Sequence, residues 1–254
     1  MIMSSKTPIL FIPFLIGFIF FGFKADIPDS NLPFVVCLGQ SNMAGRGSLL
    51  PEDSLGKVNS NIFLWNDENE WEVSIEPTNK YSNIRKSLTM QEIGPAMGMA
   101  LQLSHRFEKI GLLVNARGGS SIVQWQKGAG YYEQSLKRIR AAMKRGRLIG
   151  VIWHQGESDR KRADKYLELL TEFIQNLRED TGLPELPVIV GQIGNWKNNS
   201  DEINQVLNTV PSVVPKTGCV TAVDLSHKGD SLHFSREGQF VLGTRYGIEL
   251  MKFL

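Results

Sequence analysis

Short apolar runs that alternate with amphipathic segments are the feature that most constrains how this chain of 254 residues can fold. Each run is rich in valine, isoleucine or leucine and ends in a polar turn, which is typical of a buried strand. The segments between several of the runs carry apolar residues at helical spacing. The predicted strands are residues 34–38, 110–115, 148–153, 187–193 and 219–223.

Strands that alternate with helices are parallel and are joined by right-handed crossovers. With helices on both faces, the expected α/β architecture is a three-layer α/β/α sandwich around a five-stranded parallel sheet. Residues 61–65 and 70–73 are predicted as a short hairpin inside a long irregular section, residues 46–92. Neither a repeat nor a linker divides the remainder, so residues 26–254 are expected to form one domain. The predicted helices are residues 94–107, 131–146, 163–180, 201–207 and 235–251.

Residues 1–25 have the pattern of a secretory signal peptide. Lys6 precedes an apolar run, residues 8–23, that is short for a membrane span and contains Pro13. A secreted or periplasmic location is therefore expected, and an uncleaved N-terminal anchor is the alternative. Subtracting Lys6 and Lys24 from the 28 basic residues leaves 26 against 26 acidic ones. This balance argues against nucleic-acid binding.

The chain has two cysteines, Cys37 and Cys219, in the first and last predicted strands. Two strands are expected to lie between them, a separation of roughly 14 Å at about 4.8 Å per strand. A disulfide joins Cα atoms that lie no more than ~7 Å apart. Both thiols are therefore predicted to be free and buried.

Four polar turns follow four of the predicted strands, and in a parallel sheet all four should meet at one edge. Together they hold a serine hydroxyl, two glycines, a primary amide and an Asp-x-x-His pair, which are the groups that acyl transfer needs. A serine in such a turn is by itself more often a helix cap or turn former, so the conjunction carries the argument. The turns are residues 39–42, 117–121, 154–159 and 230–233.

Within these turns, Ser41 is the predicted nucleophile and His233 the predicted base that takes its proton. Asp230 lies three residues before His233, on the same side of one helical turn, and is predicted to hold the other ring nitrogen. The backbone N–H groups of Ser41 and Gly119 and the side-chain amide of Gln155 are predicted to receive the oxyanion. One such donor is typically worth about 3 kcal/mol of transition-state stabilisation.

Other residues of these turns are expected to touch substrate or to support the catalytic groups. His154 is equally well explained as a satisfied structural histidine. Glu157 has three candidate roles: pairing with a cation, orienting Gln155, or competing with Asp230 for His233. The expected supporting residues are Gln40, Asn42, Arg117, Gly118, Trp125, His154 and Glu157.

These motifs resemble the SGNH hydrolase superfamily, and within it the sialate O-acetylesterase-like branch that includes the acetylxylan esterases of carbohydrate esterase family six. The resemblance implies a flavodoxin-like sheet of strand order 2-1-3-4-5 and no metal. It also implies Ser41, His233 and Asp230 as nucleophile, base and partner, with Gly119 and Gln155 in the oxyanion hole; Gly118 is the alternative to Gly119. The matching segments are residues 39–45, 118–122 with Trp125, 153–159 and 230–234.

Two positions differ from the wider superfamily and fit this branch. Gln40 stands where the commoner signature has an aspartate, and Gln155 stands where the namesake asparagine would be. The sequence therefore predicts an exported serine esterase that hydrolyses O-acetyl esters of a polysaccharide or oligosaccharide through an acetyl-serine intermediate, without a cofactor. An acetylxylan esterase is favoured over a sialate esterase because the chain has no large inserted domain.

Two other classes of function are the alternatives to an esterase. The sequence does not indicate the oligomeric state. A metal-dependent hydrolase lacks support because there is no compact ligand motif such as His-Glu-x-x-His; its ligands would be His154, Glu157, His227, Asp230 and His233. The second alternative is a non-catalytic carbohydrate-binding protein. The presence of Ser41, Asp230 and His233 together argues against it, because binding alone does not need a nucleophile, a base and its partner. Its sugar-stacking residues would be Trp65, Trp71, Trp125 and Trp196, with Tyr81 as a further aromatic in the irregular section.

Overall fold

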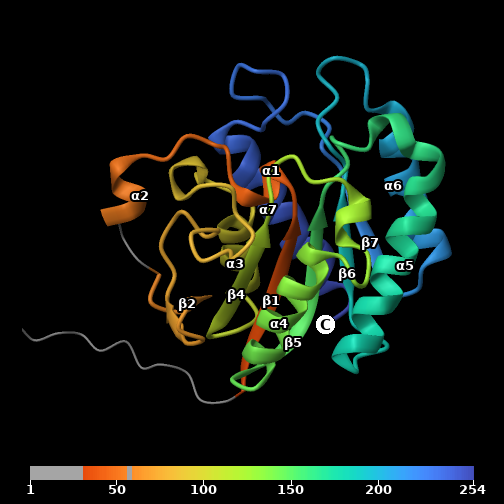
Figure 1. Cartoon of the computed structure of the whole chain (residues 1–254). Coiled ribbons are helices and arrows are strands. Elements are labelled where there is room, and N and C mark those ends of the chain that lie inside the picture. Colours follow the sequence, from red (N-terminus) through yellow and green to blue (C-terminus); the bar gives the residue numbers. More distant parts are fainter. Residues whose placement is uncertain (1–30, 56–58) are drawn as a thin grey trace, which may run out of the picture.

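A seven-stranded sheet between two layers of helices forms the body of the protein in a computed structural model that describes residues 31–55 and 59–254 (Figure 1). The order of strands across the sheet is β3-β2-β4-β1-β5-β6-β7. The predicted signal peptide, residues 1–25, lies outside the described residues. The strands are β1 (Leu32–Gly39), β2 (Ile62–Trp65), β3 (Trp71–Val73), β4 (Ile110–Ala116), β5 (Gly146–His154), β6 (Val188–Gly191) and β7 (Thr217–Val220).

The five predicted strands correspond to β4-β1-β5-β6-β7 and pair in parallel throughout, which confirms their order 2-1-3-4-5. The predicted total of five strands is wrong. The hairpin of β2 and β3 joins the same sheet, because β2 pairs in parallel with β4 while β3 runs antiparallel to β2. Trp71 of this hairpin packs on Phe34 of β1, with ring centroids 5.4 Å apart.

Helices cover both faces of the sheet. Three of them, α4, α5 and α7, follow the predicted bounds closely, whereas α3 is shorter than the predicted 94–107. The predicted segment 201–207 is, as expected, part of a longer helix, α6. Among the helices of the described part of the chain, none is long and apolar enough to cross a membrane. The helices are α1 (Ser41–Ala44), α2 (Pro51–Leu55), α3 (Ala96–Leu103), α4 (Gly130–Met143), α5 (Ala163–Thr181), α6 (Asp201–Val213) and α7 (Arg236–Met251), with 3-10 turns η1 (Leu88–Met90), η2 (Ile122–Trp125) and η3 (Arg160–Arg162).

The core has two parts because successive side chains of a strand point to opposite faces. Phe34 and Val36 of β1 belong to the cluster that α4, α5 and α6 cover, while Val35 and Cys37 belong to the cluster that α3 and α7 cover. Both cysteines are free, as predicted, although Cys219 is only half-buried. The central strand β1 is therefore buried on both sides and is a rigid base for the turn that follows it.

The irregular section after α1 folds against the carboxyl end of β4. The buried side chain of Asn79 accepts a hydrogen bond from the backbone N–H of Ala116 and donates one to its carbonyl, at 3.0 and 3.2 Å. Trp65 and Trp71 are buried in the core. The suggestion that these two tryptophans stack on a sugar is therefore wrong, because they pack the hairpin onto the sheet.

Candidate functional site

Ser41 is the first residue of the short helix α1, which begins where β1 ends (Figure 1). Gly39 has φ +142°, and a Cβ there would lie 2.1 Å from the carbonyl oxygen of His154 at the end of β5. Glycine is therefore required for the two strands to approach this closely. The backbone N–H of Gln40 donates to the same carbonyl at 3.0 Å, which fixes the turn that presents Ser41.

A continuous chain of hydrogen bonds links Ser41, His233 and Asp230. Ser41 Oγ lies 3.1 Å from His233 Nε2, and His233 Nδ1 lies 2.7 Å from Asp230 Oδ2. The three side chains come from α1 and from the loop before α7, at opposite ends of the sequence. This is the arrangement in which a base removes a hydroxyl proton while a carboxylate orients the base.

The turn that carries Asp230 and His233 is not helical, so the predicted helical turn is wrong. Ser231 has φ +53°, in the left-handed region, and residues 228–233 are bends. The turn is held by Asp230 itself, whose Oδ1 accepts the backbone N–H groups of Leu232 and His233 at 2.9 and 2.8 Å. One carboxylate oxygen therefore shapes the turn while the other holds the imidazole ring.

Desolvation acts to raise the pKa of Asp230, but hydrogen bonds outweigh it. The backbone N–H and ring of His233, together with the N–H of Leu232, stabilise the carboxylate and lower the pKa of Asp230 to about 2. Asp230 is thus ionised at neutral pH. A negative charge beside Nδ1 favours the protonated imidazole that forms when His233 takes a proton.

The glycine turn after β4 lies directly against Ser41. A Cβ on Gly118 would sit 3.6 Å from Ser41 Cβ, and the exposed Gly119 has φ +74°, a conformation that favours glycine. Among the described residues, no group accepts a hydrogen bond from the backbone N–H of Ser41 or Gly119. Both N–H groups are therefore free to receive an oxyanion.

Gln155, the third predicted oxyanion donor, does not have that geometry. Its side chain is fully buried, and its Nε2 lies within 3.1 Å of three acceptors, which are Gln40 Oε1, the Ser120 carbonyl and Asp159 Oδ2. Its Oε1 accepts the Tyr166 hydroxyl at 2.7 Å. Both amide hydrogens are thus already used, and Gln155 ties together the turns that carry Ser41 and Gly119.

Asp159 is a buried residue of this site to which the sequence reasoning gave no role. Its Oδ2 accepts hydrogen bonds from Gln155 and from the backbone N–H of Ile122, at 2.6 and 2.8 Å. Trp125 is also buried, and its Nε1 donates to Ser120 Oγ at 2.9 Å. Asp159 and Trp125 therefore hold the glycine turn from behind. The only sequence feature that could have indicated a role for Asp159 is its place at the end of the matching segment 153–159.

His154 and Glu157 are both buried beneath Ser41. His154 Nδ1 lies 2.8 Å from the Tyr246 hydroxyl, and burial lowers the pKa of His154 to about 3, so the ring is neutral. Glu157 Oε1 accepts the Asn42 side-chain amide at 2.5 Å. The three predicted roles of Glu157 do not fit these contacts. In the described part of the chain, its carboxylate contacts no Lys or Arg side chain and does not contact His233, and Gln155 is oriented by the Ser120 carbonyl and Asp159.

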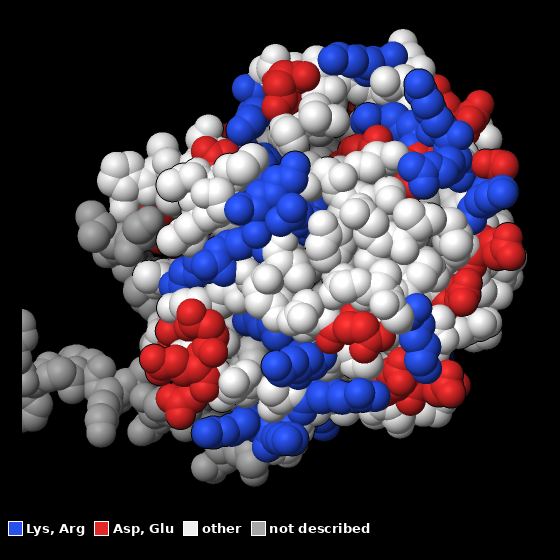
Figure 2. Space-filling view, viewed as in Figure 1, with Lys and Arg blue, Asp and Glu red and all other residues white. Residues whose placement is uncertain are grey.

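Three basic side chains lie around the glycine turn. Arg46 is buried, its Nη1 donates to the Gly45 carbonyl, and the charge of Glu92 acts on it electrostatically; its Nη2 lies 2.8 Å from where a Gly118 Cβ would be. Lys86 Nζ lies 3.4 Å from where a Cβ on Gly119 would be. Arg117 instead donates to the Ile84 carbonyl and covers the Tyr131 ring. Figure 2 shows a band of Lys and Arg side chains across this face of the molecule.

Other candidate sites carry less chemistry. Within residues 31–55 and 59–254, no three His, Cys, Asp or Glu side chains gather as metal ligands. His227, one of the candidate ligands, accepts the N–H groups of Gly229 and Ser231 on Nδ1.

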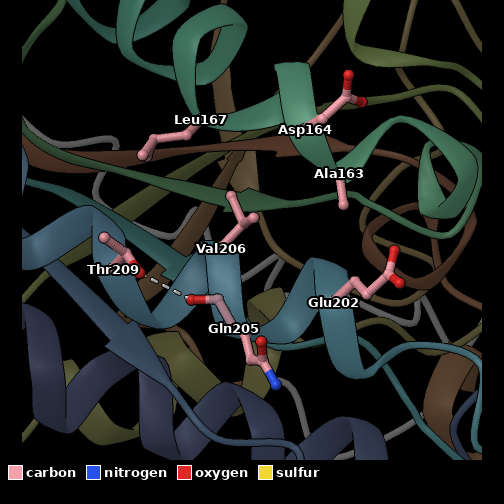
Figure 3. Close-up of a pocket in the computed structure, with 7 residues that line it drawn as sticks. All are labelled: Ala163, Asp164, Leu167, Glu202, Gln205, Val206 and Thr209. Atoms are coloured by element: carbon pink, nitrogen blue, oxygen red, sulfur yellow. Dashed lines mark hydrogen bonds between the residues drawn. The ribbon is translucent and has the colours of Figure 1, made fainter.

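Trp196, one of the candidate sugar-stacking residues, packs on His227 and Phe234. An open groove of about 420 Å³ lies between α5 and α6 and contains neither a nucleophile beside a base nor any predicted site residue (Figure 3).

The chain is similar to several known proteins. Residues 31–252 match the family described as carbohydrate esterase, sialic acid-specific acetylesterase. A protein from Arabidopsis thaliana, named as a probable carbohydrate esterase, is 32% identical over 240 residues, which cover 87% of this chain and 90% of that protein.

Three solved structures are similar to this chain. The X-ray structure of an Arabidopsis thaliana protein has a TM-score of 0.79 at 29% identity, covering 89% of this chain and 99% of that one. A carbohydrate acetylesterase from Xanthomonas citri has a TM-score of 0.60 at 18% identity, covering 84% of this chain and 57% of its own. One from Sinorhizobium meliloti has a TM-score of 0.54 at 13% identity, covering 87% and 100%. The last two share the fold.

Proposed function

The chain belongs to the sialic acid-specific acetylesterase family of carbohydrate esterases, and from this premise we propose that it is an exported serine esterase that removes O-acetyl groups from a polysaccharide or oligosaccharide. Family membership makes it a carboxylic ester hydrolase of acetylated carbohydrates. The observation that carries the proposed mechanism is the unbroken hydrogen-bonded chain from Ser41 Oγ through the His233 ring to Asp230.

In the first half of the proposed reaction, Ser41 Oγ attacks the carbonyl carbon of the acetyl group. Its proton passes to His233 Nε2, which is 3.1 Å away, and Asp230 stabilises the imidazolium through Nδ1. The bond between the carbonyl carbon and the sugar oxygen then breaks. The sugar leaves as an alcohol that carries the proton from His233, and the acetyl group stays on Ser41.

The backbone N–H groups of Ser41 and Gly119 are the proposed oxyanion donors. Their lack of acceptors among the described residues, and the contact of the glycine turn with Ser41, support this assignment. Donors that are fixed before the reaction need no reorganisation in the transition state. Gln155 has the role of holding the two turns that supply these N–H groups.

In the second half, His233 takes a proton from a water molecule, and the resulting nucleophile attacks the acetyl-serine. Collapse of that intermediate releases acetate and returns the proton to Ser41 Oγ. Each turnover thus converts one acetyl ester and one water molecule into a sugar hydroxyl and acetic acid, which ionises to acetate and a proton.

Acetylated xylan is the first candidate substrate, on the resemblance of the compact chain to acetylxylan esterases. O-acetylated sialic acid is the second, and two observations favour it: the sialic acid-specific description of the family, and the cations Arg46 and Lys86 beside the glycine turn. A sialic acid carries a carboxylate, which a guanidinium binds with charge-assisted hydrogen bonds.

Export is proposed from residues 1–25 alone, because their sequence has the pattern of a signal peptide. Cell fractionation followed by N-terminal sequencing tests this part. A protein found outside the cytoplasm and beginning near residue 26 supports cleavage. A protein found only in the cytoplasm contradicts export.

Acetate release from a panel of acetylated sugars tests the substrate. We expect activity on acetylated carbohydrate, and the panel compares acetylated xylan with O-acetylated sialic acid. Release from the xylan alone supports the first candidate, and release from the sialic acid alone supports the second. Absence of acetate release from every carbohydrate acetyl ester, with a folded protein, contradicts the proposed function.

A further inference from the structure

We propose that Asn42 and Glu157 are positioning residues that set the distance between the nucleophile and the base. Asn42 holds the backbone on both sides of His233, and Glu157 holds the Asn42 amide. This inference rests on the proposed esterase function, since the distance it concerns is that between Ser41 Oγ and His233 Nε2. It gives a role to two buried polar side chains that the reaction steps leave unused.

Asn42 is fully buried and directly follows Ser41 in α1. Its Nδ2 donates to the Leu232 carbonyl at 3.3 Å, and its Oδ1 accepts the Phe234 backbone N–H at 3.1 Å. These two bonds lie immediately before and after His233. Because Ser41 and Asn42 share one helix, the bonds connect the nucleophile's helix to the base's loop on both sides of the imidazole.

The bonds of Asn42 tie this loop to α1, whereas the loop's own bonds only shape it. Residues 228–233 are bends, closed by the Lys228 N–H to the His233 carbonyl at 3.0 Å and by the N–H groups of Leu232 and His233 to Asp230 Oδ1, and the Asp230 side chain is 38% exposed. The Ser41–His233 contact of 3.1 Å is already near the long end for this kind of hydrogen bond. A shift of the loop by ~1 Å would break it, and misplacement of that size costs about a hundredfold in rate.

Glu157 fixes the orientation of the Asn42 amide. Its Oε1 accepts Asn42 Nδ2 at 2.5 Å, so Nδ2 faces two acceptors, while Oδ1 faces the Phe234 N–H and Gln239 Nε2. A rotated amide would place its oxygen against Glu157 and the Leu232 carbonyl. The carboxyl group therefore selects the one amide orientation that holds both sides of His233.

The groups around Glu157 indicate that it serves as a hydrogen-bond acceptor and not as a catalytic acid. Its side chain is buried, and its Oε2 has no partner among the described residues. His154 Nε2 is 3.9 Å from Oε1, and Arg160 and Asp159 act on it electrostatically. Burial raises the pKa of Glu157. A neutral amide at this position keeps an acceptor oxygen.

Five variants test the inference: Asn42→Ala, Glu157→Ala, Glu157→Gln, Asp230→Asn and the control Asn66→Ala. Asn66 is also buried and accepts two backbone N–H groups, but it lies in the turn between β2 and β3. kcat and KM are measured on a soluble aryl acetate, well below each variant's melting temperature. Amide hydrogen exchange is measured at Phe234, whose only hydrogen-bond acceptor in the described structure is Asn42.

We expect Asn42→Ala to lower kcat by about ten- to a hundredfold with KM within about twofold, and to speed exchange at Phe234. Glu157→Ala should lower kcat by about tenfold, whereas Glu157→Gln should stay within about threefold of wild type. Asn66→Ala should lose stability and keep its kcat. A loss confined to kcat, restored by the conservative amide, is not what general destabilisation produces.

Three outcomes overturn the inference: unchanged Phe234 exchange in Asn42→Ala, a kcat loss in Asn66→Ala equal to that in Asn42→Ala, or a loss in Glu157→Gln as large as in Asp230→Asn. The last would make Glu157 the acid of the triad. If the wild-type protein hydrolyses no acetyl ester, the proposed function fails instead. The exchange measurement still decides whether Asn42 holds the loop.

Discussion

His233 Nε2 lies 3.1 Å from Ser41 Oγ, although the two residues are 192 positions apart in the chain. The sheet creates this contact, because β1 delivers Ser41 to the same edge at which the loop before α7 ends. The contact depends on Asn42 on one side and Asp230 on the other. The predictions below test the separate parts of this arrangement.

Replacing Asp230 by asparagine should lower kcat by roughly a hundredfold to ten-thousandfold. The amide lacks the negative charge that stabilises the imidazolium, and it favours the wrong tautomer at Nδ1, which lies 2.7 Å from Oδ2. Steady-state kinetics on an aryl acetate measure the loss. Since the side chain is partly exposed, the melting temperature should change little; a large drop would show that the activity is lost through unfolding.

Replacing Gln155 by alanine should lower the free energy of unfolding by about 3 kcal/mol or more, together with kcat. The change opens a cavity, removes the hydrogen bonds of the amide to Asp159 and Tyr166, and leaves the buried Ser120 carbonyl without its donor. Urea denaturation measures the stability. Gln192→Ala, at a half-buried amide away from Ser41, is the control and should cost less.

One result for Gln155→Ala would support the sequence-based prediction that the Gln155 amide donates to the oxyanion. In that case kcat would fall by a hundredfold or more while the free energy of unfolding stayed at the wild-type value. The structure argues against this outcome because both hydrogens of the Gln155 amide already have buried acceptors.

Glu76 should make the protein less stable as the pH rises. Burial raises the pKa of this carboxyl from 4.5 to about 8, while its Oε1 has no partner in the described structure. Because the folded state holds the proton more tightly, the stabilisation is complete below about pH 4.5 and is lost as the pH rises through about 8. Glu76→Gln should remove this dependence.

Melting temperatures of wild type and Glu76→Gln between about pH 5 and about pH 9 test the sign. The difference between the two proteins isolates Glu76 from the other titrating groups. The stability of wild type relative to the variant should fall across this range. A relative stability that rises with pH would contradict the buried, protonated state.

The sequence indicated the parallel core of the sheet and the residues that converge at its edge, because strand periodicity and turn residues are local signals. It did not indicate that β2 would join β4, since a four-residue strand carries no information about its partner. The prediction of a helical turn at Asp230 was wrong because spacing alone does not show what the Asp230 side chain bonds to. The carboxylate of Asp230 bonds to the backbone and stabilises a bend with Ser231 in the left-handed region.

The finer structure of the site depends on contacts between distant residues and could not be read from spacing. Gln155 lies in the predicted turn, but its amide points at Gln40, Ser120 and Asp159. Arg46 directly follows the serine motif, yet only the fold shows that its guanidinium reaches Gly118. The residue types at the site were thus predictable, whereas the partners of each polar group required the structure.

The most direct test of the central claim is acetate release from an acetyl ester by wild type and Ser41→Ala, with both proteins shown to be folded. The account predicts turnover by wild type and a loss of roughly a thousandfold or more in the variant, because the acetyl-serine can no longer form. Equal activity of the two proteins would show that Ser41 is only a turn residue and would contradict the account.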